Sequence, residues 1–100
     1  MTSRSVRVTN QLGLHARAAA RFVNLATRFT SHVTVARDST VMDGKSIMGI
    51  LLLAAGRGTS LTITAEGPDE AGAVAALVAL VESGFGENAS AVDPGEPWNG

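Results

Sequence analysis

The sequence predicts an α+β fold, an open-faced sandwich in which three helices cover one face of a four-stranded antiparallel sheet. Two patterns support this fold: short segments that alternate apolar and polar residues, and segments with apolar residues at helical spacing, in the order βαββαβα. Short connections favour antiparallel neighbours. With 100 residues, 45% of them hydrophobic, the chain suits one small domain, which we place at residues 1–87. Residues 88–100 are mostly small, polar or turn-forming, which predicts a flexible tail.

The first half of the chain predicts a strand, a helix and a hairpin. Val6 and Val8 alternate with polar neighbours, as in a half-buried strand. Apolar residues then recur on one helix face, at Ala16, Ala19, Phe22, Val23, Ala26 and Phe29. Residues 33–35 and 40–42 are predicted strands separated by the polar turn 37–39, which is typical of a hairpin.

A short second helix is predicted after Ser46, because serine is a favoured N-cap residue. Its inner stripe, expected to face the core, consists of Ile47, Ile50, Leu51 and Ala54. Its outer stripe consists of Met48, Leu52 and Ala55. A domain of this size cannot easily cover both stripes, so Met48 and Leu52 are expected to form a docking surface, with core packing as the alternative. The glycines at 56 and 58 are predicted to end the helix.

The last part of the domain predicts a strand and a third helix. Residues 61–65 alternate apolar residues with threonines, as in a fourth strand. Asp69 is a good N-cap for the helix that follows. The inner stripe of this helix is predicted at Val74, Leu77, Val78 and Val81, and Gly84 is predicted to close it.

Composition excludes several classes of function. The chain has no cysteine, so it has no disulfide, thiolate nucleophile or cysteine-ligated metal, and two histidines give little support for a metal site. A net charge of −1 argues against nucleic-acid binding. The longest apolar runs are far shorter than the ~20 residues that span a bilayer, and no signal-peptide pattern is visible. We therefore expect a cytoplasmic protein with no cofactor, no metal and no membrane insertion.

The charges are unevenly distributed along the chain. Six arginines and no acidic residue precede Asp38, whereas nine acidic and two basic residues occur from Asp38 onward. A basic face would suit an acidic partner or an anionic group. Alternatively, the fold brings the two halves together and their charges cancel. Charge distribution alone favours neither interpretation.

The segment Gly13-Leu14-His15-Ala16-Arg17 combines groups suited to phosphoryl transfer. His15 directly precedes the first predicted helix, whose first N–H groups and dipole form a site for an anion. Arg17 adds a guanidinium that can bind two phosphate oxygens. Both features favour the neutral, nucleophilic imidazole. On spacing alone, the simpler alternative is a histidine that only caps the helix.

The segment 13–19 resembles the active-site motif of HPr, the histidine-containing phosphocarrier family of the bacterial phosphotransferase system. A second segment, from Asp43 to Ile50, resembles the regulatory serine segment of that family. The order of elements, the turn at Gly67-Pro68 and the length to about Glu87 also agree with the family. The resemblance therefore covers nearly the whole chain except the tail.

The resemblance implies a phosphoryl carrier rather than an enzyme. Phosphorylated enzyme I would transfer its phosphoryl group to Nδ1 of His15, and the A domain of an enzyme II would receive it. Arg17 matches the phosphate-pairing arginine, and the backbone of Ala16, Arg17 and Ala18 is expected to bind the phosphate. Ala18 departs from the usual proline of the family. Alanine keeps the helix, so we expect function to survive.

The resemblance also implies regulation and docking. Ser46 matches the serine that HPr kinase/phosphorylase modifies in species that have this enzyme, although a serine that only caps the helix is the alternative. The family places the starts of the first two helices on one face. Arg21 and the other N-terminal arginines would meet an acidic surface on enzyme I, while Met48 and Leu52 fill an apolar groove. We expect the protein to act as a monomer.

Two alternative functions also involve phosphate chemistry. A regulatory phospho-signalling module of a nitrogen- or metabolism-linked branch, without sugar transport, would use the same His15, so only its partners would distinguish it. A hydrolase of the acylphosphatase type needs an arginine in a glycine-rich phosphate loop and an asparagine that positions water. Asn10 and Asn24 show no such arrangement, so this class is disfavoured.

Overall fold

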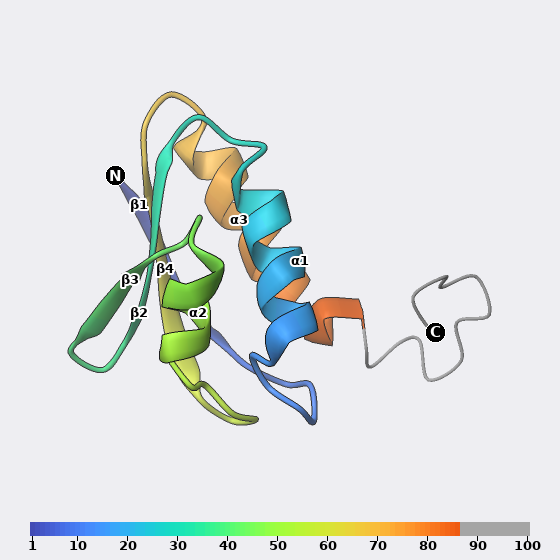
Figure 1. The fold of residues 1–100 in the computed structure, drawn as a ribbon. Helices are drawn as coiled ribbons and strands as arrows, with labels where there is room; N and C mark the ends of the chain where they lie inside the picture. The colour runs from blue at the N-terminus through green and yellow to red at the C-terminus, as the bar shows by residue number, and fades with distance from the viewer. Residues whose placement is uncertain (87–100) are drawn as a thin grey trace.

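The structure, a computed structural model, describes residues 1–86, and the predicted tail at 88–100 lies outside the described residues. The elements follow the predicted order (Figure 1): β1 (Thr2–Arg7), α1 (Ala16–Ala26), β2 (His32–Arg37), β3 (Thr40–Asp43), α2 (Ile47–Leu52), β4 (Ser60–Glu66), α3 (Glu70–Glu82) and the 3₁₀ turn η1 (Gly84–Gly86). The predicted α+β fold is thus confirmed. The domain boundary at residue 87 stays a prediction.

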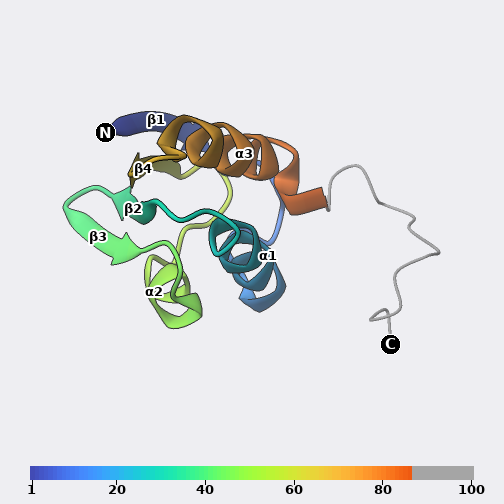
Figure 2. The same ribbon diagram turned by 90° about the horizontal axis from the view of Figure 1, so that it is seen from above.

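The four strands form one antiparallel sheet in the order β1-β4-β2-β3. Figures 1 and 2 show the three helices on one face of this sheet. Val6 lies opposite Leu61 and Val33 lies opposite Ala65, and all four are buried, because alternate side chains of a strand point to the same face. The open face carries exposed or half-buried polar residues, among them Arg7, Thr34, Thr62 and Thr64.

The two long helices bury most of the apolar residues that the sequence predicts, but Ala16, predicted on the inner face of the first helix, is exposed. α1 buries Ala18, Ala19, Phe22, Val23 and Ala26. α3 buries Ala73, Val74, Leu77, Val78 and Val81. α1 contacts both α2 and α3 and lies between them (Figure 2). In the part of the chain that the structure describes, no helix has the length and apolar character needed to cross a membrane.

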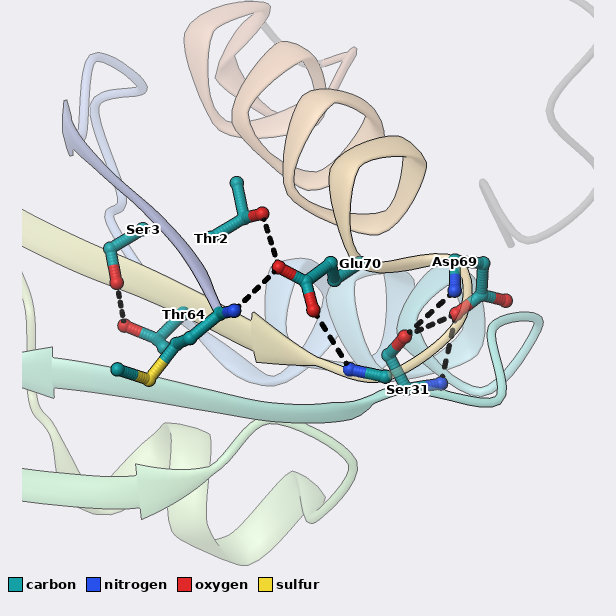
Figure 3. Close-up of polar contacts among 8 residues, drawn as sticks. Thr2, Ser3, Ser31, Thr64, Asp69 and Glu70 are labelled. Atoms are coloured by element: carbon teal, nitrogen blue, oxygen red, sulfur yellow. Dashed lines mark hydrogen bonds and ion pairs between the residues drawn. The ribbon is translucent and has the colours of Figure 1, made fainter.

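The turn between α1 and β2 is longer than predicted. α1 ends at Ala26, so Phe29 lies after the helix, with its N–H donating to the Ala26 carbonyl at 3.1 Å. Asp69 precedes α3 as predicted, but its carboxylate makes no capping hydrogen bond. It instead accepts from the backbone N–H of Thr30 at 2.9 Å. It also accepts from the backbone N–H of Ser31, at 2.9 Å, and from the Ser31 hydroxyl (Figure 3). The backbone N–H groups of this turn are therefore satisfied by a side chain that is distant in the sequence.

Two adjacent carboxylates tie the start of α3 to its surroundings. The pKa of Asp69 is lowered to about 2, mainly by the hydrogen bond from the Ser31 hydroxyl and next by the hydrogen bond from the Thr30 amide. Glu70 binds the amino group of Met1 at 2.8 Å and the Thr2 hydroxyl at 2.7 Å (Figure 3). The contact with the amino group is the main reason that the pKa of Glu70 falls to about 2.

The end of α2 also differs from the prediction. α2 ends at Leu52, and the left-handed residue that follows is Ala54, with φ of 50°, rather than a glycine of segment 56–58. The guanidinium of Arg37 donates to the carbonyl oxygens of Leu53, at 2.8 Å, and Ala54, at 2.7 Å. A cation bonded to carbonyl groups at a helix C-terminus stabilises that end, so Arg37 supports α2 where it stops.

Candidate functional site

The loop between β1 and α1 is held by close backbone packing. Gly13 has φ of 64°, and a Cβ atom there would lie 2.5 Å from the carbonyl oxygen of Ala55, so only glycine fits. The buried side chain of Asn10 donates to the Gly13 carbonyl at 2.8 Å. The N–H of Leu14 donates to the Ala55 carbonyl at 2.9 Å. The loop thus places His15 beside the segment that follows α2.

His15 occupies the N-cap position of α1. Its backbone is extended, with φ of −76° and ψ of 177°, and its carbonyl oxygen accepts a helical hydrogen bond from Ala19 at 2.9 Å. The half-buried imidazole makes no capping hydrogen bond. The structure therefore gives no support to the alternative in which His15 only caps the helix.

The first turn of α1 contains groups suited to binding an anion. The N–H groups of Ala16, Arg17 and Ala18 precede the hydrogen bond from Ala19 to His15, at the positive end of the helix dipole. No acidic residue occurs in this turn. Arg17 is exposed, whereas Ala18 is fully buried. An anion that approaches this turn meets backbone amides and a cation, and no carboxylate from the turn itself.

Ser46 caps α2 as the sequence predicts, because its Oγ accepts a hydrogen bond from the Gly49 N–H at 3.0 Å. Its phosphorylation stays a prediction. The starts of α1 and α2 are not adjacent, because the two helices run in opposite directions (Figure 1). The loop that precedes His15 bonds to Ala55, beyond the far end of α2. Ser46 and His15 therefore lie at opposite ends of α2.

The exposed residues of α2 agree only in part with the prediction. Met48 and Leu52 are 65% and 61% exposed, as expected for the outer stripe. Ile47, predicted to face the core, is 45% exposed, and Ala54 is also exposed. Ala55, assigned to the outer stripe, is only 2% exposed, because the helix ends at Leu52 and its period no longer applies. The exposed apolar surface, here called the α2 patch, consists of Ile47, Met48 and Leu52.

Arg21 lies on the side of α1 that faces α3 and η1. Its guanidinium donates to the carbonyl oxygen of Phe85, and its side chain lines a groove together with residues of α3 and η1. The structure does not bring Arg21 together with Met48 and Leu52. Its part in docking stays a prediction.

Arg37 supports the site, although the sequence placed it only in a turn. It holds the carbonyl groups of Leu53 and Ala54, and the next residue, Ala55, accepts the hydrogen bond from Leu14. The contact joins residues 16 and 17 positions apart. No local pattern signals such a pairing, so sequence reasoning had no means to find it.

Comparisons with known proteins identify the family. The family model described as "PTS HPr component phosphorylation site" matches residues 2–83. A curated relative, phosphocarrier protein HPr of Cupriavidus necator, is 47% identical over 87 residues, which cover 87% of this chain and 98% of the relative.

Solved structures agree with this assignment. HPr-C-His from Thermoanaerobacter tengcongensis is 45% identical, with a TM-score of 0.84, over 87% of this chain and 98% of that one. An HPr dimer from the same organism is also 45% identical, with a TM-score of 0.70, over 87% of this chain and 100% of that one. Within residues 1–86, no cluster of histidine and acidic side chains could hold a metal ion. On the family model, the sequence identity and the shared fold, the chain belongs to the HPr family of phosphocarrier proteins of the phosphotransferase system.

Proposed function

We propose that the protein accepts a phosphoryl group on His15 from phosphorylated enzyme I and passes it to the A domain of an enzyme II. The position of His15 carries this proposal. The residue precedes the first turn of α1, its imidazole makes no capping hydrogen bond, and no acidic side chain occurs in the turn. A phosphate on this imidazole would lie at the positive end of α1, where helices bind anions.

In the transfer, the lone pair of the neutral Nδ1 attacks the phosphorus atom of the phosphohistidine on enzyme I. The new nitrogen–phosphorus bond forms as the old one breaks, and the donor imidazole leaves with the electron pair of that bond. The phosphoryl oxygens accept hydrogen bonds from the amides of segment 16–18 and from the guanidinium of Arg17. The same exchange delivers the group to the next imidazole or other nucleophile. Because no water takes part, the protein acts as a carrier.

Phosphorylation by enzyme I and phosphoenolpyruvate tests the proposal. One acid-labile, base-stable phosphate should appear on the protein and should be absent from His15→Ala. The matched control is His32→Ala, because His32 is exposed on β2, and this variant should be labelled like the parent. Label that persists in His15→Ala would exclude His15. A panel of enzyme II A domains from sugar-linked and nitrogen-linked branches would then identify the acceptor.

Ser46 is proposed as a regulatory site for an ATP-dependent HPr kinase/phosphorylase. A phosphate would add a charge of about −1.5 to −2 next to the α2 patch, where it would repel an acidic partner. Phosphorylated Ser46 should therefore slow the labelling of His15 by enzyme I, and Ser46→Asp should slow it less. Ser39→Asp is the control, because Ser39 is exposed in the turn between β2 and β3. Equal rates for Ser46→Asp and Ser39→Asp would remove the support for regulation by charge at this position.

The α2 patch is proposed as the apolar part of the docking surface. Met48→Ala and Leu52→Ala should lower the rate of His15 phosphorylation at limiting enzyme I. Val41→Ala is the matched control, because Val41 is a 60% exposed apolar residue on β3. If all three variants react at the parent rate, the patch is not used. Arg21→Ala tests the basic part of the surface in the same assay.

The carrier is proposed to act as a monomer, whereas a relative from Thermoanaerobacter tengcongensis has been crystallised as a dimer. Sedimentation at several concentrations should give the mass of one chain throughout. A concentration-dependent rise to twice that mass would show that the dimer also forms here.

A further inference from the structure

A groove of about 480 Å³ lies between α1, α3 and η1. Its volume falls within the range of about 300–1,000 Å³ that is typical of ligand pockets. Its main apolar lining consists of Leu25, Leu80 and Phe85. Its longer polar side chains are those of Arg21, Asn24 and Arg28. Among residues 1–86, no acidic side chain lines it, so this part of the chain gives the groove an apolar surface with positive charge.

The exposed positive charge of the groove is that of Arg28. Arg28 is exposed and forms no ion pair with a carboxylate among residues 1–86. Arg21 donates to the uncharged carbonyl oxygen of Phe85. α1 itself contains no acidic residue. The groove therefore favours a segment that carries both carboxylates and a large apolar side chain.

We propose that this groove binds the C-terminal segment of the same chain, residues 87–100. The described part of the chain ends at Gly86, which itself lines the groove, so the segment begins at the site. The segment has no basic residue, and it contains three carboxylates and the only tryptophan of the chain: Glu87, Asp93, Glu96 and Trp98. The carboxylates complement Arg21 and Arg28, and an indole suits the apolar lining.

The segment is long enough to return to the groove. Along α1, from Arg21 to Leu25, the groove extends about 6 Å, at 1.5 Å per helical residue. The chain from Gly86 to Trp98 spans up to about 40 Å when extended. Because the segment is tethered at the groove, its effective concentration is of millimolar order, and individually weak contacts are sufficient to hold it.

Binding in this way gives the segment a role in partner recognition. It covers Arg21, so an acidic partner must displace it before using this side of α1. This consequence rests on the proposed function, whereas occupation of the groove does not and is measured without any phosphotransferase partner. The two ideas can therefore fail separately.

Trp98 reports on the proposal in the full chain, because the protein contains one tryptophan and no tyrosine. At low salt, its emission should be shifted to the blue and acrylamide should quench it poorly. Arg28→Glu should shift the emission to the red and raise the quenching constant about two- to fivefold, the effect of losing an exposed ion pair. Addition of 1 M NaCl to the parent should act in the same direction, because it shortens the Debye length to about 3 Å.

Two further variants make the test specific. Arg7→Glu changes an exposed arginine at the end of β1, outside the groove, and should leave the emission unchanged. Asp93→Lys with Glu96→Lys, in the Arg28→Glu background, should restore the blue shift. Equal quenching of the parent, Arg28→Glu and Arg7→Glu would overturn the proposal. A blue shift that depends on protein concentration would also overturn it, because the segment would then occupy a second copy. If Arg28→Glu does not fold, the salt titration of the parent decides.

Discussion

The backbone N–H of Leu14 donates to the carbonyl oxygen of Ala55 at 2.9 Å, which joins the loop before α1 to the segment after α2. Leu14 directly precedes His15. Arg37, at the end of β2, holds the two carbonyl groups just before Ala55. The position of His15 therefore depends on a strand end and a helix end that are distant in the sequence.

Gly13→Ala should destabilise the fold by about 1–3 kcal/mol, the cost of a left-handed conformation for a residue other than glycine, and should slow phosphorylation of His15. The added Cβ would also meet the Ala55 carbonyl. Urea denaturation measures the effect. Gly72→Ala is the control, because a Cβ in this exposed turn of α3 has no heavy-atom contact closer than 3.9 Å; it should gain about 0.5–1 kcal/mol. A fully stable Gly13→Ala variant would mean that the loop has another conformation.

Arg37→Ala should lower the free energy of unfolding by about 1–2 kcal/mol, because it removes charge-assisted hydrogen bonds to two carbonyl groups. Hydrogen exchange of the Leu14 amide should become faster, and labelling of His15 by enzyme I should slow. The control is Arg57→Ala, an exposed arginine in the nearby loop, which should change stability by less than about 0.5 kcal/mol. Unchanged exchange at Leu14 would show that Arg37 does not support the loop.

Ala18→Pro should stabilise the protein by about 0.4–1 kcal/mol, mainly by restricting the unfolded chain. Proline is tolerated in the first helical turn, and Ala18 is the third residue of α1. Thermal and urea unfolding measure the change. Ala20→Pro, two residues further into α1, should instead cost about 3 kcal/mol, because it removes an interior hydrogen bond. A clear loss of stability in Ala18→Pro would mean that the fully buried site does not admit the ring.

Ser46→Ala should cost about 1 kcal/mol of stability, because it removes the hydroxyl that caps the Gly49 N–H. Ser46→Thr should recover part of the loss. Ser39→Ala, at an exposed turn position, should stay within about 0.5 kcal/mol of the parent. Chemical denaturation of the three variants measures the cap. If Ser46→Ala and Ser39→Ala are equally stable, the hydrogen bond contributes nothing measurable.

Asp69 should make the stability depend on acid pH. Hydrogen bonds from Ser31 and Thr30 lower the pKa of Asp69 from 3.8 to about 2, so the native state favours the carboxylate. Its contribution is complete above about pH 4 and is lost as the pH falls towards 2. Asp69→Asn should be less stable than the parent at pH 7 and should lose less stability between pH 4 and 2.

The control for this pH dependence is Asp38→Asn, because Asp38 is exposed in the β2–β3 turn and asparagine accepts its φ of 55°. This variant keeps the contacts of Asp69, so it should retain the parent's loss of stability between about pH 4 and 2. Parallel pH profiles for the parent and Asp69→Asn would show that the carboxylate at position 69 titrates alike in the folded and unfolded chains.

Local pattern in the sequence determined the elements and the core of the candidate site. The apolar period of α1 and α3 predicted most of the residues that they bury, because one helix face must leave water whatever the rest of the chain does. His15 and Arg17 could be found because they are neighbours within one turn. Ser46 could be recognised as a cap because capping is a contact between close neighbours.

Tertiary contacts decided the rest. α2 stops at Leu52, and Arg37, from another element, binds the carbonyl groups that follow this end. This early stop buries Ala55, and Ile47 is exposed although its spacing placed it with the core stripe. The Asp69 carboxylate likewise does not cap its own helix, and instead accepts hydrogen bonds from the backbone of a turn 38 and 39 residues away. In these cases the contact joins residues far apart in the chain. It can stabilise the protein only when the fold brings those residues together, so local sequence patterns do not predict it.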